Sequence, residues 1–162
     1  MKNKAKTDRG AAAHSKESLR TWLRLLSCET VIEQELRSLL RKKFSVTLPQ
    51  FDVLSELERA GSPLTMSQLS QELMVSNGNV TGVIDRLEKS GFVSRSRAEH
   101  DRRIQYIDLT AAGRSQFNQM ARQHERWLAE MLSDLSPAEM RQLQELLLKA
   151  RQAADRKPAQ DA

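Results

Sequence analysis

Arginines cluster between residues 92 and 110, where two short runs of strand-forming residues flank a polar tip. Guanidinium groups bind phosphates through charged hydrogen bonds, and an arginine at a loop tip can enter the narrow minor groove of A·T-rich DNA. Arg103 is the candidate for the minor groove, because Asp101 lies two residues earlier and could brace it. The neighbouring arginines are expected to contact phosphates, and they are Arg95, Arg97 and Arg102. A solvated basic loop is the alternative interpretation.

Short polar side chains gather just before this cluster, where a helix is expected to begin. They are Ser76, Asn77, Asn79 and Thr81. Asparagine can pair with the edge of adenine, and serine or threonine can contact bases or phosphates, so this helix end could read DNA in the major groove. A helix cap would explain one or two of these residues but not all of them. Arg86 on the same helix could reach a phosphate, or could pair with Asp85 or Glu88 on the surface.

A helix-turn-helix is the element predicted to position these side chains. Thr65 and Gln68 form a capping-box pattern before a short helix, and Ser76 can cap the next helix, which Gly91 ends. Two strands over residues 92–97 and 104–109 should then form a hairpin. The expected fold class is mainly α, a winged helix-turn-helix with a two-stranded β-wing.

Helices rich in leucine and methionine are predicted on both sides of this lobe, over residues 17–46 and 111–153. The lobe of residues 47–110 is too small to cover their apolar stripes, so they are expected to form the dimerisation region of a homodimer. A monomeric helical bundle is the alternative. Residues 1–16 and 154–162 are predicted to be flexible tails, the first of them basic. Twofold symmetry would make the DNA target an inverted repeat with half-sites about 34 Å apart.

The composition is that of a globular chain, with 39% hydrophobic and 29% charged residues and a formal net charge of +5. The first 24 residues hold seven lysines or arginines and two acidic residues, so this segment carries the whole surplus. Total charge alone therefore does not indicate nucleic-acid binding. No apolar run approaches the roughly 18 residues of a membrane-spanning helix, and no secretory signal is visible, so a cytoplasmic protein is expected.

The cysteine and histidine residues of this sequence do not form a recognisable catalytic or metal-binding motif. Cys28 is the only cysteine, which excludes a disulfide framework and a multi-cysteine zinc site. Its apolar neighbours favour a small buried hydrophobe over a redox sensor. The three histidines, His14, His100 and His124, fall in a tail, a basic tip and a helix, without a glycine-rich phosphate loop or metal-ligand spacing. We expect no enzyme activity, no metal and no cofactor.

The run LTMSQLSQELMVSNGNVTGVIDRLEKSGFVSRSRAEHDRRIQYIDLTAAG resembles the MarR family of winged helix-turn-helix regulators. The resemblance includes the wing motif Asp101-Arg102-Arg103, which leads to Leu109-Thr110 and Gly113, and it extends over about residues 19–152. It implies a cytosolic homodimer, usually a repressor, that leaves its operator when a small ligand, often a phenolic or aromatic acid, binds between the dimerisation helices and the DNA-binding lobe. By position it places Arg103 in the minor groove and the polar start of the helix in the major groove.

Two further segments, LRTWLRLLSCETVIEQELR and TLPQFDVLSELE, resemble regulators of aromatic and hydroxycinnamate catabolism, some of which sense an acyl-CoA thioester. A ligand pocket could lie between the first expected helix, the helix that starts after Thr47 and the helix that follows the wing. It would be lined by Arg20, Trp22, Arg24, Leu25, Phe51, His124 and Trp127. Core or dimer packing is the alternative for the two tryptophans, and a solvated face for the arginines.

The predicted function is a ligand-responsive, DNA-binding transcriptional regulator, released from an inverted-repeat operator by a small aromatic acid or its CoA thioester. The alternatives are a helical protein–protein assembly module that does not bind DNA and a nonspecific architectural DNA-binding protein. Specific binding to an inverted repeat would separate the three.

Overall fold

A computed structural model gives the fold of the chain. It describes residues 2–97 and 104–156 and, within them, the side chains from residue 15 onward except that of Asn77. The chain divides into two compact units, residues 1–125 and 126–162, which are described separately. Helix α5 (Ala111–Met131) crosses the boundary between them. Every strand of the described residues lies in the first unit.

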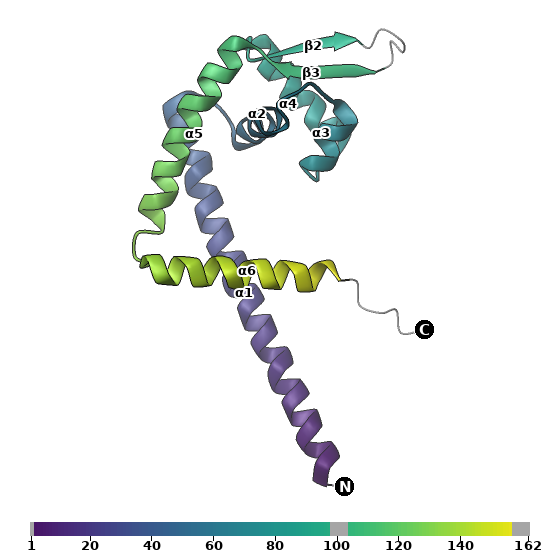
Figure 1. Ribbon diagram of the computed structural model, residues 1–162, viewed down its shortest axis with the longest axis vertical. Helices are drawn as coiled ribbons and strands as arrows, with labels where there is room; N and C mark the ends of the chain where they lie inside the picture. The colour runs from purple at the N-terminus through teal and green to yellow at the C-terminus, as the bar shows by residue number, and fades with distance from the viewer. Residues whose placement is uncertain (1, 98–103, 157–162) are drawn as a thin grey trace. The chain divides into compact units, whose positions relative to one another are not determined.

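Helix α1 (Lys2–Phe44) is one long helix, drawn in purple and blue in Figure 1. The sequence predicted a flexible tail over residues 1–16, and the structure corrects this, because the helix already includes residues 2–16. Alanine and lysine, which dominate this segment, favour helix, and continuing an existing helix avoids the cost of nucleation. Ser45 follows with a left-handed backbone (φ 56°), which ends the helix.

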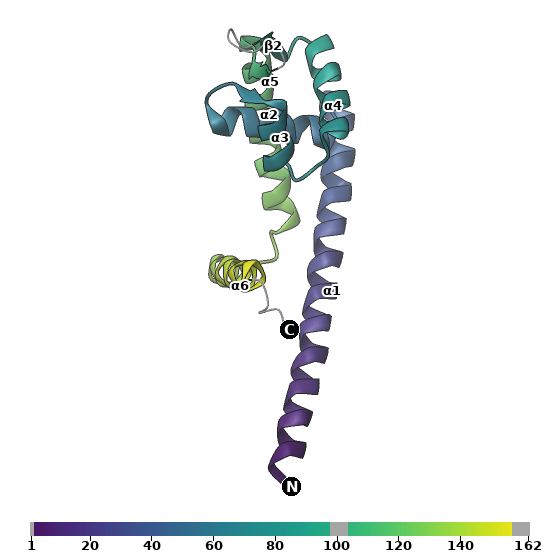
Figure 2. The same ribbon diagram turned by 90° about the vertical axis from the view of Figure 1, so that its right-hand side faces the viewer.

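Residues 45–110 form a compact lobe at the C-terminal end of α1 (Figures 1 and 2). It contains, in chain order, α2 (Leu48–Ala60), β1 (Leu64–Thr65), α3 (Met66–Glu72), α4 (Asn77–Lys89), β2 (Val93–Arg97) and β3 (Gln105–Leu109). Its core holds Val46, Val53, Leu54, Leu57, Leu69, Val80, Ile84, Leu87, Val93 and Ile107, each at most 4% exposed. The lobe therefore closes a core largely from its own residues, as the sequence predicted.

Side-chain caps fix the helix starts. Gln50 accepts a hydrogen bond from the Thr47 amide at 2.9 Å, which closes a capping box at the start of α2. Thr65 and Gln68 form the predicted reciprocal pair at α3, with N–H···O distances of 2.8 and 3.2 Å. Gly61 then terminates α2 in the left-handed conformation that only glycine adopts without strain (φ 63°). These turns set the angles at which α2 and α3 meet.

The wing belongs to a three-stranded antiparallel sheet with the strand order β1-β3-β2. In the predicted hairpin, Val93 pairs with Leu109 and Arg97 with Gln105. The third strand, β1, was not predicted, because two residues are too few to show an alternating pattern. Its pairing of Leu64 with Ile107 joins the start of α3 to the base of the wing.

The second unit contains the end of α5 and helix α6 (Pro137–Asp155). The sequence Ser136-Pro137-Ala138-Glu139 has the pattern of a capping box, and Ser136 caps α6. Its hydroxyl accepts from the Glu139 amide, and the Glu139 carboxylate accepts from the Ser136 amide at 2.9 Å. No residue of α6 is buried. Within the described residues, no helix is long and apolar enough to cross a membrane.

Large apolar side chains are exposed on both terminal helices. On α1 they are Leu19, Trp22, Leu23, Leu25, Leu26 and Val31, and on α6 they are Leu143, Leu146, Leu147 and Leu148. Cys28 is exposed as well, so the expectation of a small buried hydrophobe is wrong for the single chain. In this part of α1 the side chains from residue 15 to residue 29 are all exposed.

Candidate nucleic-acid interface

Helix α4 turns its apolar side into the lobe and its polar start to the surface. The helical spacing of Val80, Val83, Ile84 and Leu87 predicts that all four face the core. Val80, Ile84 and Leu87 are at most 1% exposed, whereas Val83 is only partly buried. Ser76, Asn79 and Thr81 are exposed. The side chain of Asn77 lies outside the described residues. Burial of one helical stripe thus fixes which side chains of α4 a partner can reach.

The N-terminus of α4 is held by backbone contacts. Ser76 occupies the N-cap position, and its carbonyl accepts from the amides of Asn79 and Val80 at 3.0 and 3.2 Å. Its hydroxyl makes no capping hydrogen bond, unlike that of Thr65 at α3. The Ser76 hydroxyl is therefore not used to cap α4, and the N-terminus of a helix favours an anionic group such as phosphate.

Arg95 has a different environment from the one expected of a phosphate contact. From β2 its guanidinium pairs with Asp85, and its Nε lies 3.2 Å from a carboxylate oxygen of Glu88, both on α4. Its side chain is only 24% exposed. Arg95 thus pairs with these two carboxylates, whereas the sequence suggested them as possible partners of Arg86. The pairing connects the wing to α4 and offsets one of the two negative charges that Asp85 and Glu88 place on that helix.

Arg86 and Arg97 keep exposed side chains at the surface. A Cβ added to Gly82 would lie 3.9 Å from Nη2 of Arg86, so the charge of Arg86 lies beside the middle of α4. Arg97 ends β2, immediately before the tip. Neither arginine belongs to an ion pair of the described residues. Asp101, Arg102 and Arg103 lie outside the described residues.

A tight joint links the wing to α5. The Thr110 hydroxyl donates to the Gly91 carbonyl at 2.6 Å and accepts from the Gly113 amide at 2.9 Å. The Thr110 amide donates to the Phe92 carbonyl at 3.1 Å. A Cβ on Gly113 would lie 1.8 Å from that carbonyl oxygen, so only glycine fits. The joint explains why threonine and glycine stand three residues apart after the wing.

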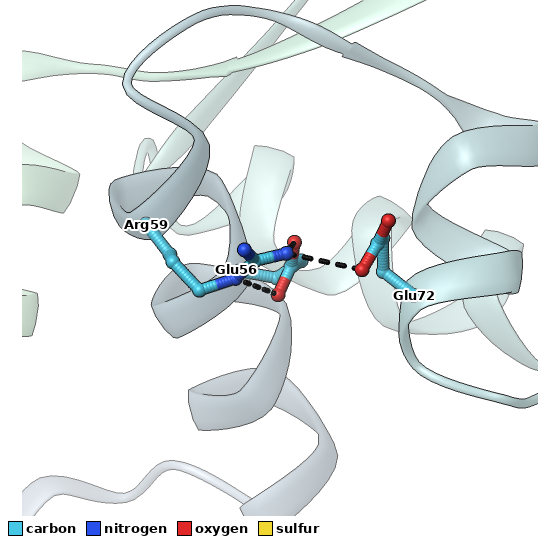
Figure 3. Close-up of polar contacts among 3 residues, drawn as sticks. All are labelled: Glu56, Arg59 and Glu72. Atoms are coloured by element: carbon cyan, nitrogen blue, oxygen red, sulfur yellow. Dashed lines mark hydrogen bonds and ion pairs between the residues drawn. The ribbon is translucent and has the colours of Figure 1, made fainter. Parts of the chain in front are cut away.

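A charged bridge between α2 and α3 was missed at the level of sequence. Arg59 binds Glu56 through Nε and Nη2 at 3.0 and 2.5 Å, and the same Nη2 lies 3.0 Å from Glu72 (Figure 3). The Arg59–Glu56 spacing of three residues is a helix signal, but the partner on α3 depends on the tertiary fold. The bridge ties the first helix of the helix-turn-helix to α2.

The residues proposed for a ligand fall into separate groups. Arg20, Trp22, Arg24 and Leu25 are exposed on α1, and Arg20 pairs with Glu17 at 2.8 Å. Phe51 is buried and stacks on His124, with ring centroids 4.8 Å apart, and on its other neighbour Phe117 at 5.6 Å. Trp127, in the second unit, is 7% exposed. Within the first unit, Phe51 contacts His124. Arg20, Trp22, Arg24 and Leu25 are near one another on α1 because they are close in sequence.

Burial shapes the chemistry of His124. It lowers the pKa of the imidazole below its ordinary value, because the charged form loses solvation. The structure therefore places His124 as a core contact between α5 and α2.

Comparison with known proteins identifies this architecture. The sequence pattern of the MarR family matches residues 46–105, which cover the lobe from α2 into β3. PecS of Dickeya dadantii (strain 3937), an HTH-type transcriptional regulator, is 35% identical over 107 residues, 65% of this chain and 64% of that protein. YkoM of Bacillus subtilis (strain 168), described as an uncharacterized HTH-type transcriptional regulator, is 36% identical over 122 residues, 75% of this chain and 77% of that protein. The match with PecS thus spans less than two thirds of that relative.

The fold is also similar to that of a mutant E. coli MarR solved in complex with operator DNA. The TM-score is 0.71 with 25% identity, over 83% of this chain and 95% of that chain. A mainly helical lobe with a small antiparallel wing and helices at both termini defines a winged helix-turn-helix protein. The chain belongs to the MarR family of transcriptional regulators. This is a family of regulators, so the expectation that the chain is not an enzyme is confirmed.

Proposed function

We propose that the chain binds double-stranded operator DNA as a homodimer and represses transcription until a small molecule releases it. The observation that carries the proposal is the exposed polar start of α4, placed beside a basic wing. E. coli MarR, with a similar fold, was solved in complex with operator DNA, which supports the same role for this lobe.

In this proposal α4 enters the major groove. Ser76, Asn77, Asn79 and Thr81 contact base edges or phosphates, since short amide and hydroxyl side chains pair with both. Arg86 and Arg97 contact phosphates, because each has an exposed guanidinium outside the ion pairs of the described residues. At the wing tip, Arg103 enters the minor groove with Asp101 as its brace, and Arg102 contacts phosphate. Arg95 acts by holding the wing against α4.

The exposed apolar side chains of α1 and α6 support a homodimer. Leu23 on α1 and Leu146 on α6 are more than half exposed, together with several leucines near each in sequence. Contiguous apolar surface of this kind is usually covered by another chain, and twofold pairing is the commonest arrangement. A twofold dimer makes the operator an inverted repeat.

The proposed effector is a small aromatic acid or its CoA thioester. Its support is the resemblance of the α1 and α2 segments to regulators of aromatic catabolism, together with the basic residues along α1. Arg24 and Arg41 are exposed cations that could bind carboxylate or phosphate groups. Calorimetry with a hydroxycinnamate and its CoA thioester tests whether the effector is the free acid or the thioester. Equal affinities for the two compounds would reject the thioester.

Fluorescence anisotropy tests DNA binding. The probes are a labelled duplex from the intergenic region upstream of the chain's own gene and a scrambled duplex of equal length. We expect binding at least about a thousandfold tighter to the first. Equal binding to both indicates an architectural protein, and binding to neither indicates an assembly module.

The Arg103→Ala variant tests the wing. Loss of a minor-groove arginine should weaken operator binding by about 1 to 3 kcal/mol while the dimer stays intact. Arg151→Ala, which removes the same charge from the exposed surface of α6, is the matched control. Unchanged operator affinity in Arg103→Ala would remove the wing from the proposal.

A further inference from the structure

A hollow of about 650 Å³ lies between α2, the turn after α3, and α4. This volume is within the range of small-molecule sites, roughly 300 to 1,000 Å³. Its apolar wall is formed by Val53, Leu73, Val75, Val80 and Val83. None of the seven residues proposed for the aromatic acid lines it, so it is a separate candidate site. We call it the α2–α4 hollow.

The charged residues of the α2–α4 hollow are all acidic. They are Asp52, Glu56 and Glu72. Arg59 binds the last two carboxylates from outside the lining, in the bridge drawn in Figure 3. One guanidinium thus faces two carboxylates, and a negative charge remains at this wall. The described residues contain no group of three acidic, histidine or cysteine side chains that could hold a metal ion.

Among the described residues, Asp52 belongs to no ion pair. Its nearest charges beyond the hollow are Glu33 and Arg37 on α1, and these two pair with each other. Arg59 is occupied by Glu56 and Glu72. Burial and then repulsion from Glu33 destabilise the carboxylate more than attraction to Arg37 stabilises it, so the pKa of Asp52 is raised to about 6. A cation placed in the hollow would relieve this repulsion.

Met74 stands at the edge of the same hollow. Its side chain is 89% exposed, and its backbone is left-handed (φ 54°), a conformation that a methionine adopts only at a cost. A flexible thioether adapts to apolar groups of varied shape. An apolar ligand body in the hollow would give this side chain a partner.

We propose that the α2–α4 hollow binds an amphiphilic organic cation, with its apolar body against Leu73, Val75 and Val83 and its ammonium group against Asp52. The ligand class is opposite in charge to the proposed aromatic acid, and the site is distinct from the arginines of α1. Asn79, Val80 and Val83 belong to α4, so an occupant touches the recognition helix directly.

Isothermal titration calorimetry on the full chain without DNA tests this site. Three probes share a phenyl ring and four methylene groups and differ in the head group: 4-phenylbutylamine is a cation, 4-phenylbutanol is neutral and 5-phenylpentanoate is an anion. We expect the ammonium probe to bind at least about tenfold more tightly than the other two. Equal affinities, or tighter binding of the carboxylate, would overturn the proposal. Because no DNA is present, the result does not depend on the operator.

Substitutions locate the bound probe. Asp52→Asn keeps the shape and removes the charge, and it should weaken ammonium binding by about tenfold. Asp134→Asn, the same change at an exposed residue outside the hollow, should leave it unchanged. Ser55→Phe fills the hollow and should abolish binding even if Asp52→Asn alters the local structure. Wild-type affinity in both Asp52→Asn and Ser55→Phe would exclude the hollow as the site.

The pH dependence gives an independent readout. The amine stays protonated from about pH 5 to about pH 8, whereas Asp52 ionises within that range. Affinity for 4-phenylbutylamine should therefore rise with pH in the wild type and stay level in Asp52→Asn. A level profile in the wild type would contradict a contact with Asp52.

Discussion

Because Gly113 has no side chain, the start of α5 can pack directly against the backbone of Phe92. A Cβ there would lie 1.8 Å from the Phe92 carbonyl oxygen, and both partners are backbone. Neither can move without breaking the Thr110 contacts to Gly91 and Phe92. Gly113→Ala should therefore lower the free energy of unfolding by about 2 to 3 kcal/mol in urea denaturation.

Gly82→Ala is the matched control for this prediction. Gly82 lies within α4, where the nearest atom to an added Cβ is the end of the Arg86 side chain at 3.9 Å. Replacing a helical glycine by alanine with room to spare should raise stability by about 0.5 to 1 kcal/mol. A loss of stability in Gly82→Ala as large as that in Gly113→Ala would contradict the packing described for the joint.

Asp52 makes stability depend on pH in a defined direction. Its pKa rises from the ordinary 3.8 to about 6 on folding, so the folded chain holds the proton more tightly. The stability linked to this group is fully present below about pH 4 and is lost as pH rises through about 6. Asp52→Asn should therefore raise the free energy of unfolding by about 1 kcal/mol near pH 7.5, a value reduced for partial exposure.

Thermal and urea unfolding across pH checks this prediction. The difference between Asp52→Asn and the wild type should vanish near about pH 4, where both side chains are neutral. Asp134→Asn should follow the wild type throughout. A destabilised Asp52→Asn at about pH 7.5 would show that the carboxylate has a favourable partner in the folded chain.

At the scale of elements, the ion pairs of Arg95 determine how the wing sits on α4. If Arg95 acts through Asp85 and Glu88, Arg95→Gln should weaken operator binding without changing the slope of log affinity against log salt. Arg97→Gln removes an exposed phosphate contact and should reduce that slope by about 1. Salt titrations of both variants make the comparison. A reduced slope in Arg95→Gln would restore it as a phosphate contact.

Helix starts and the apolar face of α4 were accessible from sequence. Thr65 with Gln68 and Ser136 with Glu139 satisfy backbone amides locally, and local rules predict them. The partner of Arg95 could not be predicted, because Asp85 and Glu88 come near it only once the wing packs on α4. The α2–α4 hollow and the strand β1 were missed for the same reason, since both depend on tertiary contacts.

The start of α1 was misjudged for a different reason. A polar, alanine-rich segment has no apolar periodicity, and the absence of a stripe predicted a tail. Helix propensity and continuity with the following turns are sufficient to extend the helix over residues 2–16. An apolar period in a sequence indicates burial rather than helicity, so a helix without an apolar stripe is not found by this pattern.

For the whole molecule, the exposed leucines of α1 and α6 are the basis of the proposed dimer. A carboxylate within an interface would have to be buried unpaired, so Leu23→Glu and Leu146→Glu should each shift the protein to monomers. Gln152→Glu adds the same charge at another exposed position of α6 and should leave the dimer intact. Light scattering after size exclusion gives the masses. Monomers that still bind the operator at wild-type affinity would separate assembly from DNA binding.

Sedimentation equilibrium of the protein with its footprinted inverted-repeat duplex tests the central claim most directly. A twofold pair of lobes should give a complex of two chains on one duplex, and a duplex with a single half-site should bind far more weakly. One chain per duplex, or equal binding to the inverted repeat and a scrambled sequence, would contradict the account.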